Sequence, residues 1–264
     1  MHVASLHCYP IKGCRGHAVP SVSIDELGVV GDRRLMLVDE RGRFLSQREA
    51  PSLATIATAI DGASLTVSVG DAVLRHDVSP AGAQRSVVVL GEQMLAVDQG
   101  DAAAVWFSAM IGQPCRLVFF GPTSLRRIDP EFSPRDDAQT AFTDGFPLLG
   151  VVQESLDALN TRLDEPIPMA RFRPNVVVAG APAWSEDGWG ALALGDVTLD
   201  AVKPCARCVV TTTDQLTGQR HAHQEPLRTL ASFRNQRPFG AIFGQNLVPR
   251  GPGTIAVGDP ITMV

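Results

Sequence analysis

Short runs of aliphatic and β-branched residues, separated by glycine and proline, recur along the whole chain of 264 residues. Runs of this length between turn-forming residues are typical of β-strands. We expect strands at 35–39, 64–69, 73–78, 86–90, 117–120, 175–179, 197–202, 208–213 and 254–258. Many short strands at close spacing indicate sheets or a barrel rather than a parallel α/β fold.

Helical patterns are few, and the clearest covers residues 152–163. Leu156, Leu159 and Leu163 form one apolar stripe there, at the spacing of a helix face. A second pattern covers residues 101–112, which predicts another helix. The fold class that we expect is therefore mixed and predominantly β, with a few helices.

The ends of the second helix carry their own signals. Asp101 stands where an N-cap would be, and Gly112 stands where a helix commonly stops. The chain divides around residues 80–90, because short strands fill the first part, while the second contains both helices. We take residues 1–85 and 86–264 as the two domains. The segment 121–145 is long and irregular, and such loops are usually functional or mobile.

Composition narrows the classes of protein. Hydrophobic residues make up 45% of the chain and charged residues 19%, which suits a soluble protein with a real core. The net charge is −5, so a general nucleic-acid surface is not expected. No apolar run is long enough to span a membrane, and the N-terminus lacks the apolar core of a signal peptide. Five cysteines, an odd number, favour reduced thiols and a cytoplasmic location.

The segment 203–214, KPCARCVVTTTD, places Cys205 and Cys208 three residues apart. A redox Cys-x-x-Cys pair opens a helix, and VVTTT is a poor helix start. A structural zinc site needs four ligands, and an iron–sulfur cluster needs four cysteines or an equivalent set. The other cysteines form no second pair, although two histidines lie downstream, so zinc stays open. These residues are Cys8, Cys14, Cys115, His221 and His223.

Buried cysteines often act only as small hydrophobic residues, and this interpretation suits Cys205. Cys208 differs because Arg207 precedes it and Lys203 is near, and both charges favour a thiolate. A thiolate is a good ligand for a soft metal. Spacing alone does not decide between these alternatives.

Three basic fragments extend the picture: 9–16 (YPIKGCRG), 31–39 (GDRRLMLVD) and 170–178 (ARFRPNVVV). Each sets a lysine or arginine beside a turn or a strand end, where it could hold a phosphate. For any single fragment, a solvated strand end is the preferred interpretation. Together with Cys208, they indicate an anionic cofactor that carries a soft metal.

These motifs resemble those of MOSC-domain proteins with an N-terminal β-barrel, the group that includes the mitochondrial amidoxime-reducing component and bacterial hydroxylaminopurine reductases. The matching blocks, in order along nearly the whole chain, are YPIKGCRG, GDRRLMLVDERGRFLSQREAPSLATI, FTDGFPLLGVVQESLDALNTRL, RFRPNVVV, KPCARCVVTTTDQLTGQR, FGQNLV and PGTIAVGDP. The resemblance implies an N-terminal MOSC β-barrel domain over 1–85 and a β-barrel MOSC domain over 86–264.

The resemblance also implies a molybdenum cofactor (Mo-molybdopterin) with Cys208 as the protein ligand to the metal. Residues around the pyranopterin and its phosphate would be Lys12, Gly13, Arg33, Arg173, Asn175, Ala206 and Arg207. Gly145 and Phe146 would contribute backbone contacts only, and Asn246 stands where some relatives carry a tyrosine.

The implied activity is reduction of N-hydroxylated compounds such as amidoximes and hydroxylamino bases. Cys208 and Asp144 are the catalytic candidates; Asp144 is either a proton donor or simply a turn aspartate. The chain has no Gly-x-Gly-x-x-Gly after a strand and no ferredoxin-type cysteine set, so we expect a separate ferredoxin- or cytochrome-like electron donor. The alternative is a carrier of molybdenum cofactor or sulfur without turnover. The six histidines receive no role.

Overall fold

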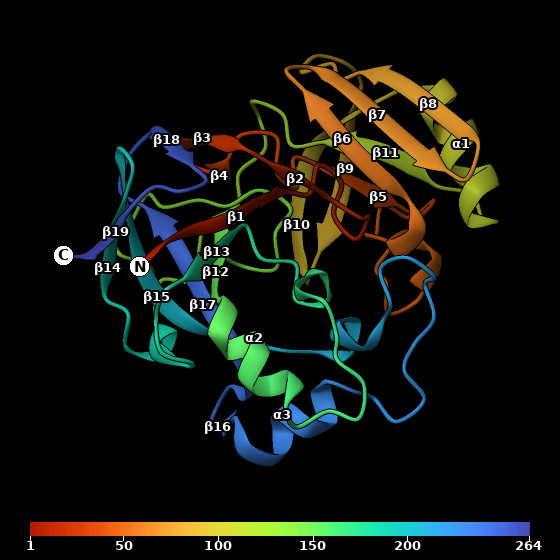
Figure 1. The fold of residues 1–264 in the computed structure, drawn as a ribbon. Coiled ribbons are helices and arrows are strands. Elements are labelled where there is room, and N and C mark those ends of the chain that lie inside the picture. Colours follow the sequence, from red (N-terminus) through yellow and green to blue (C-terminus); the bar gives the residue numbers. More distant parts are fainter.

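The computed structural model describes residues 1–264, and β-strands dominate it (Figure 1). The strands are β1 (His2–Cys8), β2 (His17–Val19), β3 (Ser21–Asp25), β4 (Gly28–Val29), β5 (Leu35–Val38), β6 (Ala57–Asp61), β7 (Ser64–Val69), β8 (Ala72–Asp77), β9 (Gln84–Val89), β10 (Glu92–Asp98), β11 (Arg116–Phe119), β12 (Leu148–Val152), β13 (Val176–Ala179), β14 (Ala191–Leu194), β15 (Val197–Ala206), β16 (Asn235–Gln236), β17 (Gly240–Pro249), β18 (Gly253–Ala256) and β19 (Ile261–Met263). The α-helices are α1 (Asp101–Ile111), α2 (Gln153–Asn160) and α3 (Leu227–Phe233), and the short 3-10 turns are η1 (Pro51–Thr55), η2 (Met169–Arg171), η3 (Ser185–Gly188) and η4 (Val209–Thr212).

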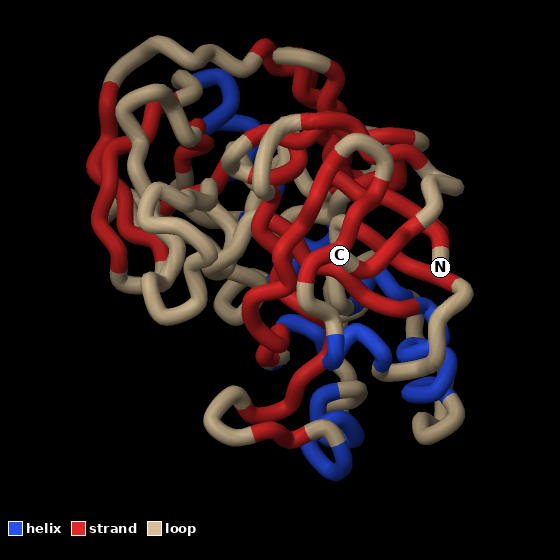
Figure 2. The backbone as a smooth tube through the Cα atoms, turned by 90° about the vertical axis from the view of Figure 1, so that its left-hand side faces the viewer, coloured by secondary structure: helices blue, strands red, loops and turns tan.

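The largest sheet has nine strands, in the order β19-β14-β15-β17-β12-β13-β1-β2, with β16 paired to β17. Its pairings are antiparallel except for β12 with β13. The sheet brings both chain ends together, because His2 bridges to Pro260 and the Ile261 amide donates to the Met1 carbonyl at 3.1 Å. The termini lie on the same side of the molecule in both backbone views (Figures 1 and 2).

Three smaller sheets complete the fold, in the orders β5-β11-β10-β9, β18-β3-β4 and β6-β7-β8. The last sheet lies beside α1, whereas α2 and α3 lie near the opposite end of the molecule (Figure 1). The predicted class, predominantly β with a few helices, is confirmed, and the strand pairings leave each sheet open rather than closing a barrel. None of the helices is long and apolar enough to cross a membrane.

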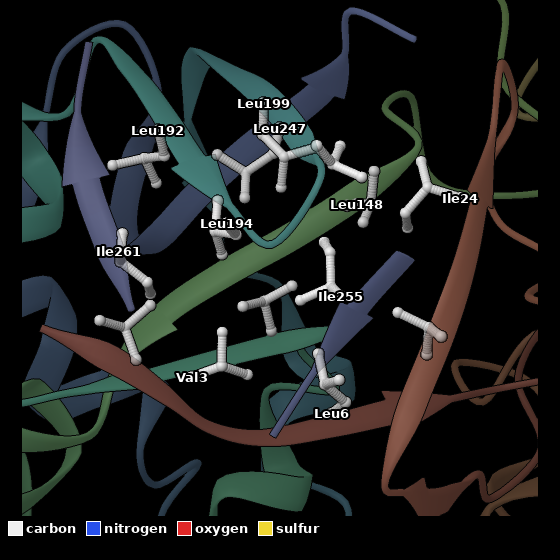
Figure 3. Packing of buried hydrophobic residues seen from close by; sticks show 14 of the residues in the cluster. Val3, Leu6, Ile24, Leu148, Leu192, Leu194, Leu199, Leu247, Ile255 and Ile261 are labelled. Carbon is white, nitrogen blue, oxygen red and sulfur yellow. The ribbon is translucent and has the colours of Figure 1, made fainter. Parts of the chain in front are cut away.

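The main core lies between the large sheet and the β18-β3-β4 sheet. It joins the first and last strands of the chain, since Val3 and Leu6 pack with Leu194, Ile255 and other apolar residues that solvent does not reach. In Figure 3 these side chains converge on one centre from β1, β3, β12, β14, β15, β17, β18 and β19. Alternation along the strands produces this arrangement, because every second side chain points to the same face.

Most predicted elements are confirmed within a few residues, but the strand expected at 208–213 is wrong. Residues Val209–Thr212 form η4, in which the Thr211 and Thr212 hydroxyls donate to the carbonyls of Cys208 and Val209 at 2.9 and 2.7 Å. These bonds give the backbone an alternative to a sheet ladder. The threonine run therefore forms a turn in spite of its β-branched side chains.

The ends of α1 give one confirmation and one correction. Gly112 ends the helix in the left-handed region with φ of 80°, as expected of a glycine C-cap. The N-cap prediction is wrong, because Gly100 occupies that position and Asp101 is the first helical residue. The Asp101 carboxylate instead accepts from Arg116 Nη2 at 2.9 Å.

The domain boundary at 85/86 stays a prediction. Sheets cross it repeatedly, since β1 pairs with β13, β3 with β18, and β5 with β11. The two parts of the chain therefore share their sheets and their main core.

Candidate functional site

One pocket collects the loops after β1, β4, β5 and β15 and the loops before β12 and β13, together with residues of β12, β15 and β17. Its cavity volume is about 160 Å³, and its lining includes all twelve residues predicted for the site. They are Lys12, Gly13, Arg33, Asp144, Gly145, Phe146, Arg173, Asn175, Ala206, Arg207, Cys208 and Asn246. Their roles stay predictions, but the structure brings all of them together.

The charge of this pocket is opposite to that of the whole chain. Five basic residues line it, Lys12, Arg33, Arg48, Arg173 and Arg207, against the single acid Asp144. Because the chain as a whole carries −5, basic groups are concentrated here. A pocket of this kind attracts an anion.

Cys208 directly precedes η4 and places its thiol near Arg48, whose Nη2 lies 3.8 Å from Sγ. Arg48 makes no ion pair. Arg220 Nη2 donates to the backbone carbonyls of Gln47 and Arg48, which holds this segment beside the thiol. Sequence reasoning missed Arg48, although it lies in the matched block FLSQREAPSL.

Arg207 does not serve Cys208 as its position in the sequence suggested. Its Nη1 lies 2.8 Å from Cys205 Sγ, and its Nη2 donates to the Phe172 carbonyl at 2.7 Å. Both residues follow the end of β15, and their side chains contact different partners there. The guanidinium that contacts the Cys208 thiol is that of Arg48.

Lys12 and Asp144 form an ion pair between the loop after β1 and the loop before β12. Lys12 is buried, whereas the Asp144 side chain is 80% exposed to the open cavity. The Lys12 ammonium holds the pKa of Asp144 well below its usual range. Burial lowers the pKa of Lys12, and Asp144 opposes this effect. Gly13, in the left-handed region at φ of 84°, allows the turn that directs Lys12 inward.

Tyr9 contacts two guanidinium groups. Arg33 and Arg173 stand 4.5 and 4.4 Å from the centre of its ring. Arg33 is neutralised by Asp32 at 2.6 Å, but Arg173 has no acidic partner and its buried Nη2 has no hydrogen-bond acceptor. Burial, assisted by Arg33, lowers the pKa of Arg173 to about 10. An unpaired buried cation of this kind calls for an anion.

Asn175 lies at the same wall but has little left to offer a ligand. Its Oδ1 accepts from Arg33 at 3.1 Å and from the Leu149 amide at 3.2 Å, and its Nδ2 donates to the His7 carbonyl. The side chain is fully buried. Asn175 thus positions Arg33 and β12, a role that the sequence did not reveal.

Two buried glutamines connect the N-terminal loops to the segment after η4. Gln47 donates to the Gly13 carbonyl at 2.6 Å and to Gln215, whose Oε1 also accepts from Arg173 Nη1 at 3.2 Å. This network holds Gly13 and Arg173 at a fixed separation across the pocket.

The residues present fit an anionic cofactor that carries a soft metal. The unpaired Nη2 of Arg173 and the buried, unpaired Nε of Arg207 supply donors for anionic and polar groups, and Cys208 supplies one thiol. No three His, Cys, Asp or Glu side chains lie close enough together to hold a metal ion by themselves. A metal at Cys208 would therefore need most of its ligands from the cofactor.

Comparison with known proteins identifies the family of this chain. Residues 1–114 match the family described as "MOSC N-terminal beta barrel domain", and residues 137–262 match "MOSC domain". Mitochondrial amidoxime-reducing component 1 of Homo sapiens is 35% identical over 281 residues, which cover 99% of this chain and 82% of the relative. The protein of that name from Mus musculus is 34% identical with the same coverage.

A third relative has a different name and architecture. Molybdenum cofactor sulfurase of Oryza sativa is 30% identical over 281 residues, which cover 98% of this chain but only 34% of the relative. Every one of these matches extends over almost all of the present sequence. The chain belongs to the MOSC family, and it joins a MOSC N-terminal β-barrel domain to a MOSC domain.

Proposed function

We propose that this protein is a molybdenum-cofactor-dependent reductase of N-hydroxylated compounds such as amidoximes and hydroxylamino bases. The observation that carries the proposal is the pairing, in one basic pocket, of the Cys208 thiol beside Arg48 with the unpaired buried guanidinium of Arg173. The similarity to amidoxime-reducing components over nearly the whole chain supports the same reaction.

The cofactor would be held by residues of both parts of the chain. Cys208 would be the metal ligand, and Lys12, Arg48 and Arg173 would bind anionic groups of the pyranopterin and its phosphate. Arg33 and Asn175, already satisfied within the protein, would fix the shape of this wall. When bound, the cofactor supplies a two-electron redox centre.

The overall reaction fixes what the protein must deliver. Cleavage of the N–O bond consumes two electrons and two protons and gives an amidine, or an amino base, and water. Because Lys12 holds Asp144 ionised, a role as proton donor requires that this carboxylate first take up a proton. We propose that the pair works as a unit, in which the ammonium of Lys12, made more acidic by burial, bears the transferable proton.

The two electrons must come from a separate protein in this proposal. The cysteines are free and scattered, and three of the five are buried away from the pocket. A ferredoxin- or cytochrome-like protein would therefore reduce the loaded enzyme, and NAD(P)H alone should support no turnover.

The test compares the molybdenum and pterin content of the purified wild type, Cys208→Ser and the control Cys205→Ser. We expect stoichiometric molybdenum in the wild type and the control, and its loss in Cys208→Ser. Loaded protein should then reduce benzamidoxime when an electron donor is supplied. Molybdenum content that is unchanged in Cys208→Ser would show that Cys208 is not the metal ligand.

A second candidate is a carrier that delivers molybdenum cofactor, or sulfur as a persulfide on Cys208, to another protein. The similarity to the Oryza sativa molybdenum cofactor sulfurase favours it. The two functions separate when loaded protein is reduced and then mixed with benzamidoxime. Reoxidation identifies a reductase, and no reoxidation identifies a carrier.

A further inference from the structure

An aromatic cluster extends from the pocket to the molecular surface. Phe146 lines the pocket, Phe132 lies 6.5 Å from it between ring centres, and Phe239 lies 6.1 Å from Phe132. The rings come from the loop 121–145, the segment before β12 and the turn between β16 and β17. All three are partly exposed. We call these three rings the aromatic rim.

The ammonium of Lys203 sits among the rings of the aromatic rim. Its Nζ lies 3.9 Å from the centre of the Phe132 ring, 5.5 Å from that of Phe239 and 5.8 Å from that of Phe146. It has no ion pair and no hydrogen bond to a side chain. Three ring faces around one cation form a site that binds cations in general.

Local backbone geometry directs Lys203 to this place. The register of β15 against β17 shifts between Ala201 and Lys203, and such a bulge re-aims the side chain beside it. Lys203 then pairs with Asn246, which lines the pocket. The loop that carries Phe132 is hydrogen-bonded to β17, since Arg135 Nη1 donates to the Pro249 carbonyl at 2.7 Å.

The use of lysine in this chain is itself unusual. Among 23 lysine and arginine residues, Lys12 and Lys203 are the only lysines. One lines the pocket and the other fills the adjoining aromatic rim. A compact ammonium fits among three rings, where a planar guanidinium would stack on one.

The substrate and the product of the proposed reaction differ in charge, so a cation held among the rings affects their binding differently. An amidoxime is a weak base and is neutral near pH 7, whereas the amidine formed from it is a strong base and is cationic. A free aromatic rim would attract the cationic product, but a rim already filled by Lys203 repels it. The exposed parts of the three rings can still pack against the flat, neutral body of an aryl substrate.

We propose that Lys203 and the aromatic rim select neutral, planar N-hydroxylated substrates and disfavour the cationic amidine product. The proposal rests on the proposed function for the reaction that links these two compounds. The binding preference itself is a property of the side chains, so it can be measured without turnover.

The test measures dissociation constants of benzamidoxime and benzamidine by ligand-observed NMR, with the protein as purified and no reductant. We expect wild type to bind benzamidoxime more tightly, and Lys203→Met to reduce the ratio of the two constants about tenfold, by admitting the cation to the rings. Lys203→Arg keeps the charge and should keep most of the preference. Phe239→Leu should weaken benzamidoxime binding.

The matched control is Arg162→Met, which removes a cation 4.3 Å from the Phe233 ring, away from the pocket. It should leave both constants unchanged. A second readout is reductive ¹³C-methylation of lysine, in which the methyl signal of Lys203 should be shifted upfield by ring currents and should move when benzamidoxime is added.

Equal ratios in wild type and Lys203→Met, or no binding of benzamidoxime to wild type, would overturn the proposal. Its failure is distinct from failure of the proposed function. Protein that shows the binding preference but reduces no N-hydroxylated compound would refute the reductase and leave the selective site in place. Protein that reduces benzamidoxime but shows no binding preference would refute the selective site and leave the proposed reductase in place.

Discussion

Arg173 shows at the scale of one residue how a binding site can oppose stability. Its guanidinium is buried beside Arg33 and Tyr9, has no acidic partner, and leaves Nη2 without an acceptor. A buried charge without compensation costs free energy of folding. We expect Arg173→Met to leave the Tm of cofactor-free protein unchanged or to raise it, while the variant retains less cofactor on purification.

The matched comparison for this prediction is Arg171→Met. Arg171 donates to the Thr212 carbonyl at 2.8 Å and forms an ion pair with Asp214 at 3.2 Å. Arg173 has no ion pair to lose, and its side-chain hydrogen bond goes from Nη1 to Gln215. Thermal unfolding should therefore show a lower Tm for Arg171→Met than for Arg173→Met. The reverse order would show that Arg173 is already compensated without a ligand.

The pKa of Asp144 depends mainly on the Lys12 ammonium, with smaller effects from Arg33 and Arg48. Because the Lys12 ammonium holds its pKa low, Lys12→Met should return that pKa toward the ordinary carboxyl range. The measurement is the ¹³C chemical shift of the Asp144 carboxyl carbon as a function of pH, in wild type and in Lys12→Met. An unchanged titration of Asp144 in Lys12→Met would show that Arg33 and Arg48, rather than Lys12, lower the pKa of this carboxyl.

Glu186 gives a prediction of pH-dependent stability. It is fully buried, accepts from the Ser155 hydroxyl at 2.7 Å, and leaves Oε1 unpaired. Burial raises its pKa, so the folded state binds this proton more tightly than the unfolded state. The contribution of this protonated carboxyl to the free energy of unfolding is fully present below the ordinary carboxyl pKa. It is lost as pH rises through the pKa of Glu186 in the folded state.

In wild type, this effect should make the free energy of unfolding fall as pH increases, and Glu186→Gln should lack that fall. Urea unfolding at a series of pH values measures the slope in both proteins. Glu154→Gln is the control, because that residue is partly exposed and accepts from the Gly180 amide at 2.8 Å. A slope in Glu186→Gln equal to that of wild type would contradict the prediction.

At the scale of an element, the end of α1 depends on one glycine. Gly112 has φ of 80°, and an added Cβ would meet nothing within 4 Å, so only backbone strain opposes a side chain there. We expect Gly112→Ala to lower the free energy of unfolding by about 1 kcal/mol. Gly190→Ala, which also meets no atoms and lies outside the left-handed region, should change it little in the same urea titration.

The elements also show what the sequence can and cannot predict. Period-two runs locate β7 and β8 well, because a local pattern determines which face of a strand is buried. The threonine run after Cys208 misleads, because its hydroxyls bond to the backbone of η4. The partners of each strand come from segments far apart in sequence, which a local pattern does not contain.

For the site too, local motifs predict some features, whereas contacts between distant segments determine others. Its twelve predicted residues carry recognisable motifs, and the fold brings all of them to one pocket. Arg48 lies in a matched block, but its contact with Cys208 spans 160 positions in the sequence, so no local pattern identifies it as a site residue. The satisfied state of Asn175 likewise depends on His7 and Leu149, which only the folded chain brings near.

At the scale of the whole molecule, the first 85 residues are built into the remainder. They supply β1 and β2 to the large sheet, β3 and β4 to the sheet of β18, and β5 to the sheet of β11. They also supply Val3, Leu6, Val22 and Ile24 to the main core. Without them, β13, β18 and β11 would present unpaired edges beside exposed apolar side chains.

We therefore expect the fragment 86–264 to fold poorly by itself, although the sequence suggests a boundary there. Far-UV circular dichroism should show no cooperative thermal transition, and amide NMR signals should be poorly dispersed. Co-expression with the fragment 1–85 is the control, and it should restore both. The pocket should return with it, because Lys12, Arg33 and Arg48 come from the first fragment and Cys208 from the second. A cooperative transition of the fragment 86–264 alone would show that its own sheets suffice for folding.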